Sequence, residues 1–199
     1  MSCAALLAIF TWLPSPAWAD SAALVAAMEV PTDDLLIAQI IGLPEAHGVR
    51  ENLGALRPTA GERFAVLSTG PLSAFSQPGQ DMGRHSELDD EVVFILQLRP
   101  PPGARALQFD FFFLSAELSE FVGSAYNDTF SAEVSGPAWS GDAARDSHNN
   151  PISINNVFFD VTESINLIGS GFGLGVGGGT GWLTATIPAQ TGAPLTLLG

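Results

Sequence analysis

Acidic and amide side chains gather between residues 117 and 128, directly after a run of phenylalanines. Carboxylate and amide oxygens are the ligands that Ca²⁺ prefers, and calcium needs several of them from neighbouring loops. A second acidic loop, at residues 89–90, offers further carboxylates. The sequence therefore suggests a calcium site, and its candidate ligands are Glu117, Glu120, Asn127, Asp128, Asp89 and Asp90.

Catalysis is a weaker explanation for the same carboxylates. Glu117 and Glu120 would suit the acid and base of a glycoside hydrolase only if they face each other across a cleft, and an acidic chain offers many such pairs. The histidines at positions 47, 85 and 148 have no zinc-binding spacing, and Ser68 lacks the G-x-S-x-G context of a hydrolase nucleophile. We therefore expect no enzymatic activity.

Two larger acidic groups have a simpler explanation as loops. The first comprises Asp81, Glu87, Asp89, Asp90 and Glu91. The second comprises Asp142, Asp146, Asn149, Asn150, Asn155 and Asn156. Neither matches an EF-hand or a repeat-type calcium motif. Each of these groups, and the group at residues 117–128 as well, is more typical of a solvated or turn-forming loop, because Asp and Asn side chains hydrogen-bond readily to nearby backbone.

Aromatic side chains beside polar loops suggest an alternative function as a carbohydrate-binding module. Tyr126 and Trp139 are the candidate ligand-binding residues, since aromatic rings stack on sugars. Burial in the core is the competing explanation for Trp139 and for Trp182, and it is the commoner fate of tryptophan.

The elements that would position these residues are mostly strands. Residues 109, 111 and 113 are alternating phenylalanines, as one face of a strand requires. Strands are predicted at residues 64–70, 92–98, 106–114, 130–134 and 152–161, with a proline-rich connector at 100–103. One short helix is predicted over residues 32–42, with Thr32 as its cap and Gly42 at its end. The predicted fold is all-β, a β-sandwich or jelly roll with one short N-terminal helix.

The N-terminal residues resemble a secretion signal. Residues 3–13 are apolar but too short to span a bilayer, and Ala17-Trp-Ala19 is a small-x-small cleavage site. The predicted organisation is a signal peptide at 1–19, an N-terminal segment at 20–32 and one domain at 33–199. Cleavage would remove the only cysteine, Cys3, so the mature domain would have no disulfide. No second apolar stretch is long enough for a transmembrane anchor.

Composition restricts the class of partner. The net charge is -14, and all seven basic residues are arginines. Such a surface repels nucleic acid and anionic membranes, and it favours divalent cations or basic partners. The glycine-rich residues 169–181 are expected to form a flexible or closely packed loop.

Four segments together resemble the bacterial choice-of-anchor L domain family. Residues 115–130 (SAELSEFVGSAYNDTF) closely match its signature, S-x-E-x-x-E-F-V-G-S-x-Y/F-N-D-x-F. Residues 34–39 resemble its first helix, residues 66–70 its first core strand, and residues 151–156 (PISINN) a later strand. Residues 179–184 are similar to a further segment of some members.

The resemblance implies an exported or cell-surface β-rich domain with a structural or adhesive role. No catalytic activity defines the family, and no agreed ligand set comes with it. Family members usually continue beyond the position of residues 195–199 with further strands, whereas this chain has no anchor there. The missing strands would leave the sheet edge beside Leu195 to Leu198 unpaired unless another chain or element covers it, and we expect a C-terminally truncated copy.

Overall fold

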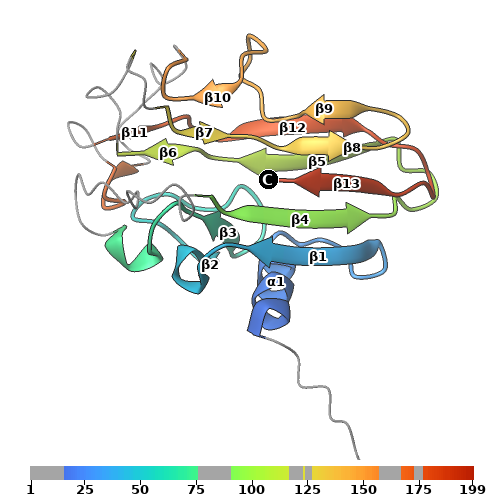
Figure 1. The fold of residues 1–199 in the computed structure, drawn as a ribbon, viewed down its shortest axis with the longest axis horizontal. Coiled ribbons are helices and arrows are strands. Elements are labelled where there is room, and N and C mark those ends of the chain that lie inside the picture. The colour runs from blue at the N-terminus through green and yellow to red at the C-terminus, as the bar shows by residue number, and fades with distance from the viewer. Residues whose placement is uncertain (1–15, 76–90, 117–122, 124–126, 157–166, 173–176) are drawn as a thin grey trace, which may run out of the picture.

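The computed structural model describes residues 16–75, 91–116, 123, 127–156, 167–172 and 177–199 (Figure 1). This part of the chain contains one α-helix, two short 3-10 helices and antiparallel strands, which makes the fold all-β. The elements are α1 (Pro16–Ala27), β1 (Leu35–Ile41), η1 (Pro44–Ala46), β2 (His47–Arg50), β3 (Phe64–Leu67), η2 (Leu72–Ala74), β4 (Val93–Leu98), β5 (Ala106–Phe111), β6 (Leu114–Ser115), β7 (Thr129–Phe130), β8 (Glu133–Ser135), β9 (Ser140–Asp142), β10 (Ile152–Ser153), β11 (Gly178–Gly179), β12 (Leu183–Pro188) and β13 (Leu195–Leu198).

The largest sheet has five strands in the order β1-β4-β13-β8-β9. In β4, the buried residues Phe94, Leu96 and Leu98 alternate with partly exposed ones, so one face of the strand points into the core. The register places Leu96 beside Leu197, and Leu197 beside Val134, all three of them buried. This row of aliphatic side chains forms the inner face of the sheet.

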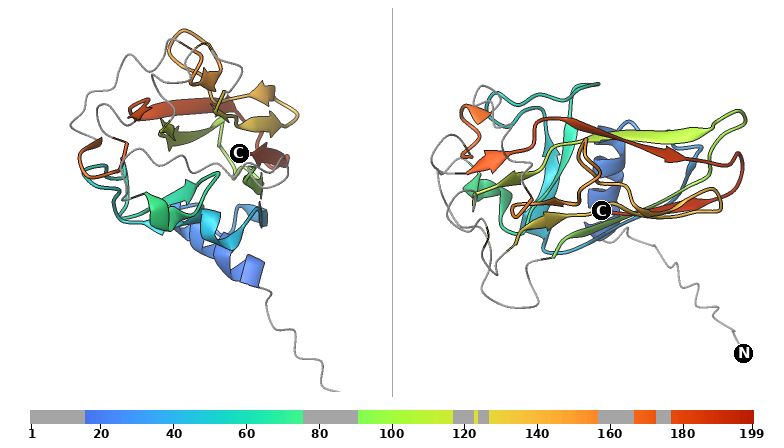
Figure 2. Two further views of the ribbon diagram at one scale, coloured as in Figure 1. Left: turned by 60° about the vertical axis from the view of Figure 1, so that its left-hand side comes forward. Right: turned by 90° about the horizontal axis from the view of Figure 1, so that it is seen from above.

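The β12–β5 pair lies behind the five-stranded sheet in the view of Figure 1, and the view from above in Figure 2 separates the two layers. Phe111 on β5 and Ile187 on β12 join the inner face of the large sheet in one core. Leu24 and Val25 of α1 belong to the same core and are 1% and 4% exposed. Full burial of a side chain of this size stabilises a fold by about 1.5–3 kcal/mol.

Helix α1 ends for a clear local reason. Glu29 has the left-handed conformation, with φ of 54°. The Val30 amide donates to the Val25 carbonyl at 3.2 Å, and the Glu29 amide donates to the Ala26 carbonyl at 3.2 Å. This pair of bonds is the Schellman pattern, which satisfies the last carbonyls of a helix.

The predicted helix over residues 32–42 is wrong, because that segment contains β1. Residues 32–34 form a turn instead, in which the Asp34 amide donates to the Pro31 carbonyl and the Leu35 amide to the Thr32 carbonyl. Ile40 is buried, whereas Ile37 and Ile41 are 46% and 50% exposed. The β-branched isoleucines suit this extended strand, and pairing with β4 outweighed the capping signal.

The expectation of an unpaired edge beside residues 195–198 is also wrong. β13 lies inside the five-stranded sheet and pairs with β4 on one side and β8 on the other. The strands at the two edges are β1 and β9. Partners so distant in sequence leave no local signal, which explains the error.

The other predicted strands compare as follows. The predictions at 64–70 and 92–98 are confirmed by β3 and β4. The predicted strand at 106–114 is divided into β5 and β6, and the one at 130–134 into β7 and β8. Residues 157–161 of the last prediction lie outside the described part of the chain.

Helix α1 runs across the predicted cleavage point between Ala19 and Asp20. Cleavage there would leave residues 20–27, including the buried Leu24 and Val25, in the domain. Among the described helices, none is both long and apolar enough to traverse a lipid bilayer.

Candidate functional site

The candidate site is the end of the molecule where the signature segment meets the Pro151–Asn156 segment. β7, within the signature, pairs with β10 of the other segment, with Phe130 opposite Ile152 and Thr129 opposite Ser153. β6, where the signature begins, pairs with β11. These four short strands lie towards the left-hand end of the molecule in Figure 1. Two motifs that are separate in the sequence are therefore neighbours in the structure.

Ser115 and Asp128 connect the two ends of the signature. The Ser115 hydroxyl donates to Asp128 Oδ2 at 2.7 Å, and Ser115 is only 2% exposed. A hydroxyl bound to a carboxylate is a charge-assisted bond, about twice as strong as a neutral one. The Asp128 carbonyl also accepts the Ile154 amide at 3.1 Å, which ties the same residue to the second motif.

Asparagines complete this connection. Asn127 Oδ1 accepts the backbone amide of Asn155 at 3.1 Å, and Asn155 Oδ1 accepts the Gly123 amide at 2.6 Å. The Asn156 side chain donates to the Pro151 carbonyl. The two asparagines of PISINN therefore bind backbone groups, and we refer to Ser115, Asn127, Asp128 and Asn155 as the signature brace.

The predicted calcium ligands divide into two sets. Asn127 and Asp128 lie side by side in the signature brace, each with one side-chain oxygen already accepting a hydrogen bond from the protein. The other four, Glu117, Glu120, Asp89 and Asp90, lie outside the described residues. Within the described ranges, no three His, Cys, Asp or Glu side chains come together as a metal site would need. The calcium site stays a prediction.

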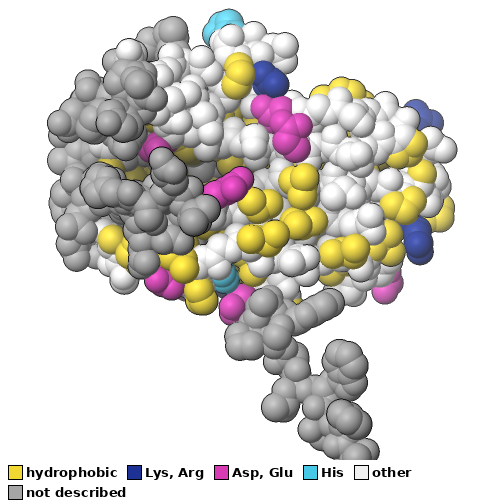
Figure 3. Space-filling model, viewed as in Figure 1, with side chains coloured by type: hydrophobic (Ala, Val, Ile, Leu, Met, Phe, Trp, Pro, Cys, Tyr) yellow, Lys and Arg dark blue, Asp and Glu magenta, His cyan; other side chains and the backbone are white. Residues whose placement is uncertain are grey.

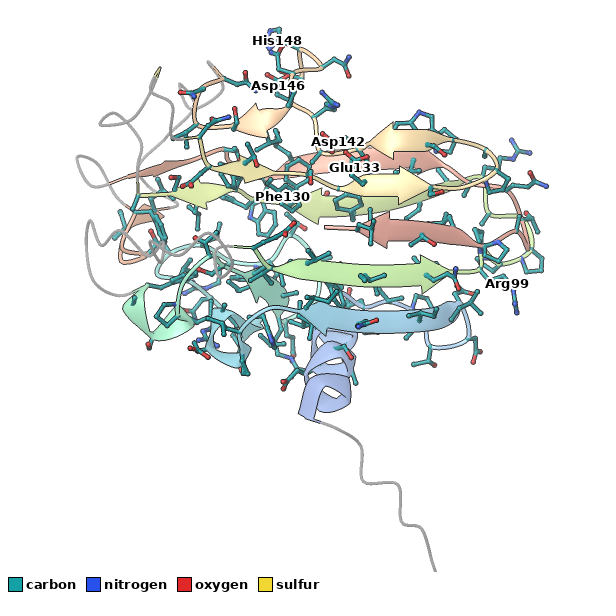
Figure 4. The ribbon with its side chains drawn as sticks, viewed as in Figure 1. Arg99, Phe130, Glu133, Asp142, Asp146 and His148 are labelled. Carbon is teal, nitrogen blue, oxygen red and sulfur yellow. The ribbon has the colours of Figure 1, made fainter. Side chains whose placement is uncertain are left out.

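The second acidic group forms turns, one of the two roles expected for it. Asp142 Oδ1 accepts the amides of Ala132 and Ala144, each at 3.0 Å, and Oδ2 lies 3.3 Å from the Arg145 guanidinium. Asp142 therefore joins β9 to the backbone before β8. Figure 4 shows Asp142 beside Glu133, with Asp146 and His148 in the loop above.

Asp146 organises the loop that leads to β10. Its Oδ1 accepts the His148 amide at 2.8 Å and the Asn150 amide at 2.7 Å, while Oδ2 accepts the Asn150 side chain at 2.9 Å. Burial disfavours the charged form of this carboxyl, but the hydrogen bonds from Asn150 and His148 outweigh it, so the pKa of Asp146 is lowered. Asn149 takes the left-handed conformation with φ of 67°, which asparagine tolerates well.

The two tryptophans of the predicted domain, Trp139 and Trp182, both pack against other residues of the protein. The Trp182 indole donates to the Arg57 carbonyl at 3.0 Å, and its ring packs edge-on against Phe64 and Phe112. Trp139 is half-buried against the main core and covers Gly141, whose Cβ position would lie 3.3 Å from the indole ring. Tyr126, the other candidate sugar-binding residue, lies outside the described residues.

One polar network was missed in the sequence. Asp110 lies on the exposed side of β5 and accepts the hydroxyls of Thr184 and Thr59, each at 2.6 Å. The hydrogen bond from Thr184 lowers the pKa of Asp110 most, followed by that from Thr59. The alternation of residues 109–113 predicted that Asp110 faces outwards, but its partners depend on non-local pairing.

The glycine-rich segment packs closely where it is described. β11 pairs with β6, and a Cβ on Gly177 would lie 2.6 Å from the Ser115 carbonyl. A Cβ on Gly179 would lie 2.5 Å from the Phe112 ring. Of the two alternatives for residues 169–181, close packing is confirmed here, whereas residues 173–176 lie outside the described part.

A pocket of about 200 Å³ lies away from the signature brace. It opens between the loop after α1, the end of β4 and the start of β5. Aliphatic residues form most of its walls, and its charged lining residues in the described chain are Glu29, Asp34 and Arg99. This arrangement does not bring a nucleophile and a base together.

Comparison with known proteins found no matching family model, no similar curated protein and no similar solved structure. The resemblance to the choice-of-anchor L domain family therefore stays a prediction. The geometry adds one observation of its own, which is that the signature and PISINN motifs are held together by hydrogen bonds.

Proposed function

We propose that this chain is a secreted or cell-surface module with a structural or adhesive role and no catalytic role. Its fold is proposed to be a β-sandwich, in which the five-stranded sheet and the β12–β5 pair are the two layers. The mixed core of Phe111, Ile187, Leu96 and Leu197 supports that assignment. A rigid scaffold of this kind acts by presenting loops and faces to partners.

The observation that carries the proposal is the signature brace. The most distinctive polar residues of the signature that are described, Ser115, Asn127 and Asp128, bind other parts of the protein. Catalytic carboxylates instead need an open cleft and a reacting partner within reach. The hydrogen bonds of the signature brace indicate that these residues hold three segments in a fixed arrangement, namely Ser115, residues 127–128 and the Pro151–Asn156 segment.

Export and adhesion are tested together with the 199-residue chain produced in a bacterial host. Mass spectrometry of the extracellular and envelope fractions should find a chain that begins at Asp20. Beads coated with the purified protein should then adhere to bacterial cells more strongly than beads coated with albumin. A chain that stays in the cytoplasm with its first residues intact would contradict the proposal.

The same preparation distinguishes the competing functions. Release of reducing sugar from a polysaccharide panel, lost in Glu117→Gln, would establish a hydrolase and overturn the proposal. Bead adhesion abolished by a free sugar and by Trp139→Ala would instead favour the carbohydrate-binding alternative. The calcium prediction has a separate test, since bound calcium raises the melting temperature and a chelator reverses the rise. A melting curve unchanged by both would remove it.

A further inference from the structure

The outer face of the five-stranded sheet carries an apolar patch. It consists of the aliphatic side chains of Ile37, Ile41, Val93, Ile95 and Leu198. The register places Ile41 opposite Val93, and Ile95 opposite Leu198, so these side chains adjoin across three strands. Ile37, Ile41 and Leu198 are 46%, 50% and 39% exposed. Figure 3 shows hydrophobic side chains gathered across the middle of this face.

The three strands under the patch contain no charged residue, although the whole chain has 28. On these three strands the polar side chains of this face are uncharged, and Gln97 donates to Thr196 at 3.4 Å. This neutral strip with exposed isoleucines contrasts with the acidic composition of the chain, and the largest apolar patch of a protein is often functional.

Charged residues border the apolar patch. Glu133 is exposed and directly opposite Leu198 in the register, whereas Asp142 on the next strand is paired with Arg145 at 3.3 Å. Glu91, also exposed, precedes β4 at the end where Ile41 and Val93 lie. The exposed Arg99 follows β4 at its other end. Figure 4 shows Glu133 and Asp142 next to each other on this side of the sheet. A partner that covers the patch therefore meets the exposed carboxylates of Glu133 and Glu91 along two parts of its border.

A second copy of the chain is a poor occupant. Each copy carries a net charge of -14, which opposes self-association. Anionic lipid is disfavoured by the same charge.

We propose that the apolar patch binds a cationic protein surface, one with aliphatic or aromatic side chains at its centre and Lys or Arg around them. Burial of the patch supplies the affinity, while Glu133, Glu91 and the net negative charge attract and orient the partner. The inference rests on the proposed adhesive function, for which it names the binding face and the chemistry of the partner.

The probe is a synthetic peptide of alternating Leu and Lys, whose affinity for the 199-residue chain is measured by fluorescence anisotropy. Two comparison peptides replace Leu by Ser or Lys by Glu, and both should bind much more weakly. The variant Ile37→Thr/Ile95→Thr/Leu198→Thr should lose about ten-fold or more in affinity, because three side chains of the patch would bury less apolar surface against the peptide. Threonine keeps the strand preference, so the fold is expected to persist.

Matched variants separate the patch from general charge attraction. Ile168 is 63% exposed and lies in the loop beside Gly54, away from this sheet, so Ile168→Thr should leave the affinity unchanged. Glu133→Gln should weaken binding about two- to three-fold at low salt, and Glu62→Gln should have less effect. As an independent measurement, a photoreactive cross-linker on the peptide should label β1, β4 and β13.

Four results would overturn the inference. The first is a folded triple variant that binds the Leu/Lys peptide as the unaltered chain does. The second is cross-linking confined to other elements, which decides the matter even if the triple variant fails to fold. The third is a concentration-dependent dimer, lost in the triple variant, which would identify a second copy as the occupant. The fourth is patch-dependent binding to phosphatidylglycerol vesicles. Failed bead adhesion with intact peptide binding would count against the adhesive function alone.

Discussion

Removal of the Ser115 hydroxyl tests whether the signature brace stabilises the fold. Ser115→Ala keeps the Cβ atom but deletes the donor of the 2.7 Å bond to Asp128. Hydrogen bonds to charged groups contribute about 1.5–3 kcal/mol, and Asp128 is only partly buried, so water compensates for some of the loss. We expect the free energy of unfolding to fall by about 2 kcal/mol.

A double-mutant cycle isolates this bond from the other interactions of Ser115. The cycle compares Ser115→Ala, Asp128→Ala and the double variant, and we expect a coupling energy of about 1–1.5 kcal/mol. Urea unfolding followed by tryptophan fluorescence supplies the free energies. In thermal unfolding, Ser115→Ala should lower the midpoint by about 4–8 °C for a domain of this size.

Ser135 provides the matched control, since it is a strand serine whose side chain is exposed. Ser135→Ala should change the free energy of unfolding by less than about 0.5 kcal/mol. A coupling energy below about 0.5 kcal/mol between Ser115 and Asp128 would refute the reasoning. The signature would then need another physical explanation than a brace.

Three further predictions concern backbone, charge and core. Gly54→Ala should destabilise the fold far more than Gly103→Ala: both glycines have positive φ, but only at Gly54 would a Cβ lie 2.3 Å from backbone atoms of the 168–170 loop. Thr184→Val should reduce the acid sensitivity of the fold. The pKa of Asp110 is lowered in the folded state, so its stabilisation is present above the unfolded pKa of about 3.9 and lost as the pH falls through the folded value. Leu24→Ala should cost about 2–5 kcal/mol, because Leu24 is 1% exposed in the main core.

Each of these predictions has a control within the chain. Equal effects of the two glycine variants in urea unfolding would contradict the close approach of Gly54. Thr186→Val, at an exposed position of β12, should leave the acid unfolding curve unchanged, and an identical shift in both threonine variants would disprove a specific role for Asp110. Leu24→Ala is compared with Ala22→Ser on the exposed side of α1, and stability unaffected by Leu24→Ala would mean that the helix does not belong to the core.

Local patterns predicted some of the strands of this protein. β5 follows from the alternation of residues 109–113, and the outward position of Asp110 follows with it, whereas β4 is a nearly continuous apolar run next to the proline-rich connector. The segment at residues 32–42 shows the limit of such reasoning. Thr32 and the two following aspartates are typical of a helix start, and Gly42 is typical of a helix end. The segment between them nevertheless forms β1, because β4 pairs with it along its length.

The arrangement of the strands, by contrast, was not predictable. The central position of β13 depends on β4 and β8, which lie far away along the chain. The sequence placed the candidate site in the signature segment, but it did not predict that the Pro151–Asn156 segment is the neighbour of that segment. The role of Asp128 could not be inferred, because its partner Ser115 is brought to it by the fold rather than by a recognisable spacing.

The position of β13 has a consequence for the order of folding. Gln97 and Thr196 are bonded across 99 positions of the chain, so the five-stranded sheet has a high contact order. During synthesis, β4 and β8 emerge before the strand that joins them, and neither has its central neighbour until residues 195–198 are made. The nascent chain therefore cannot complete this sheet early and should fold slowly, after most of it has been translated. Such delay would suit a polypeptide that crosses a membrane through a narrow channel before it folds.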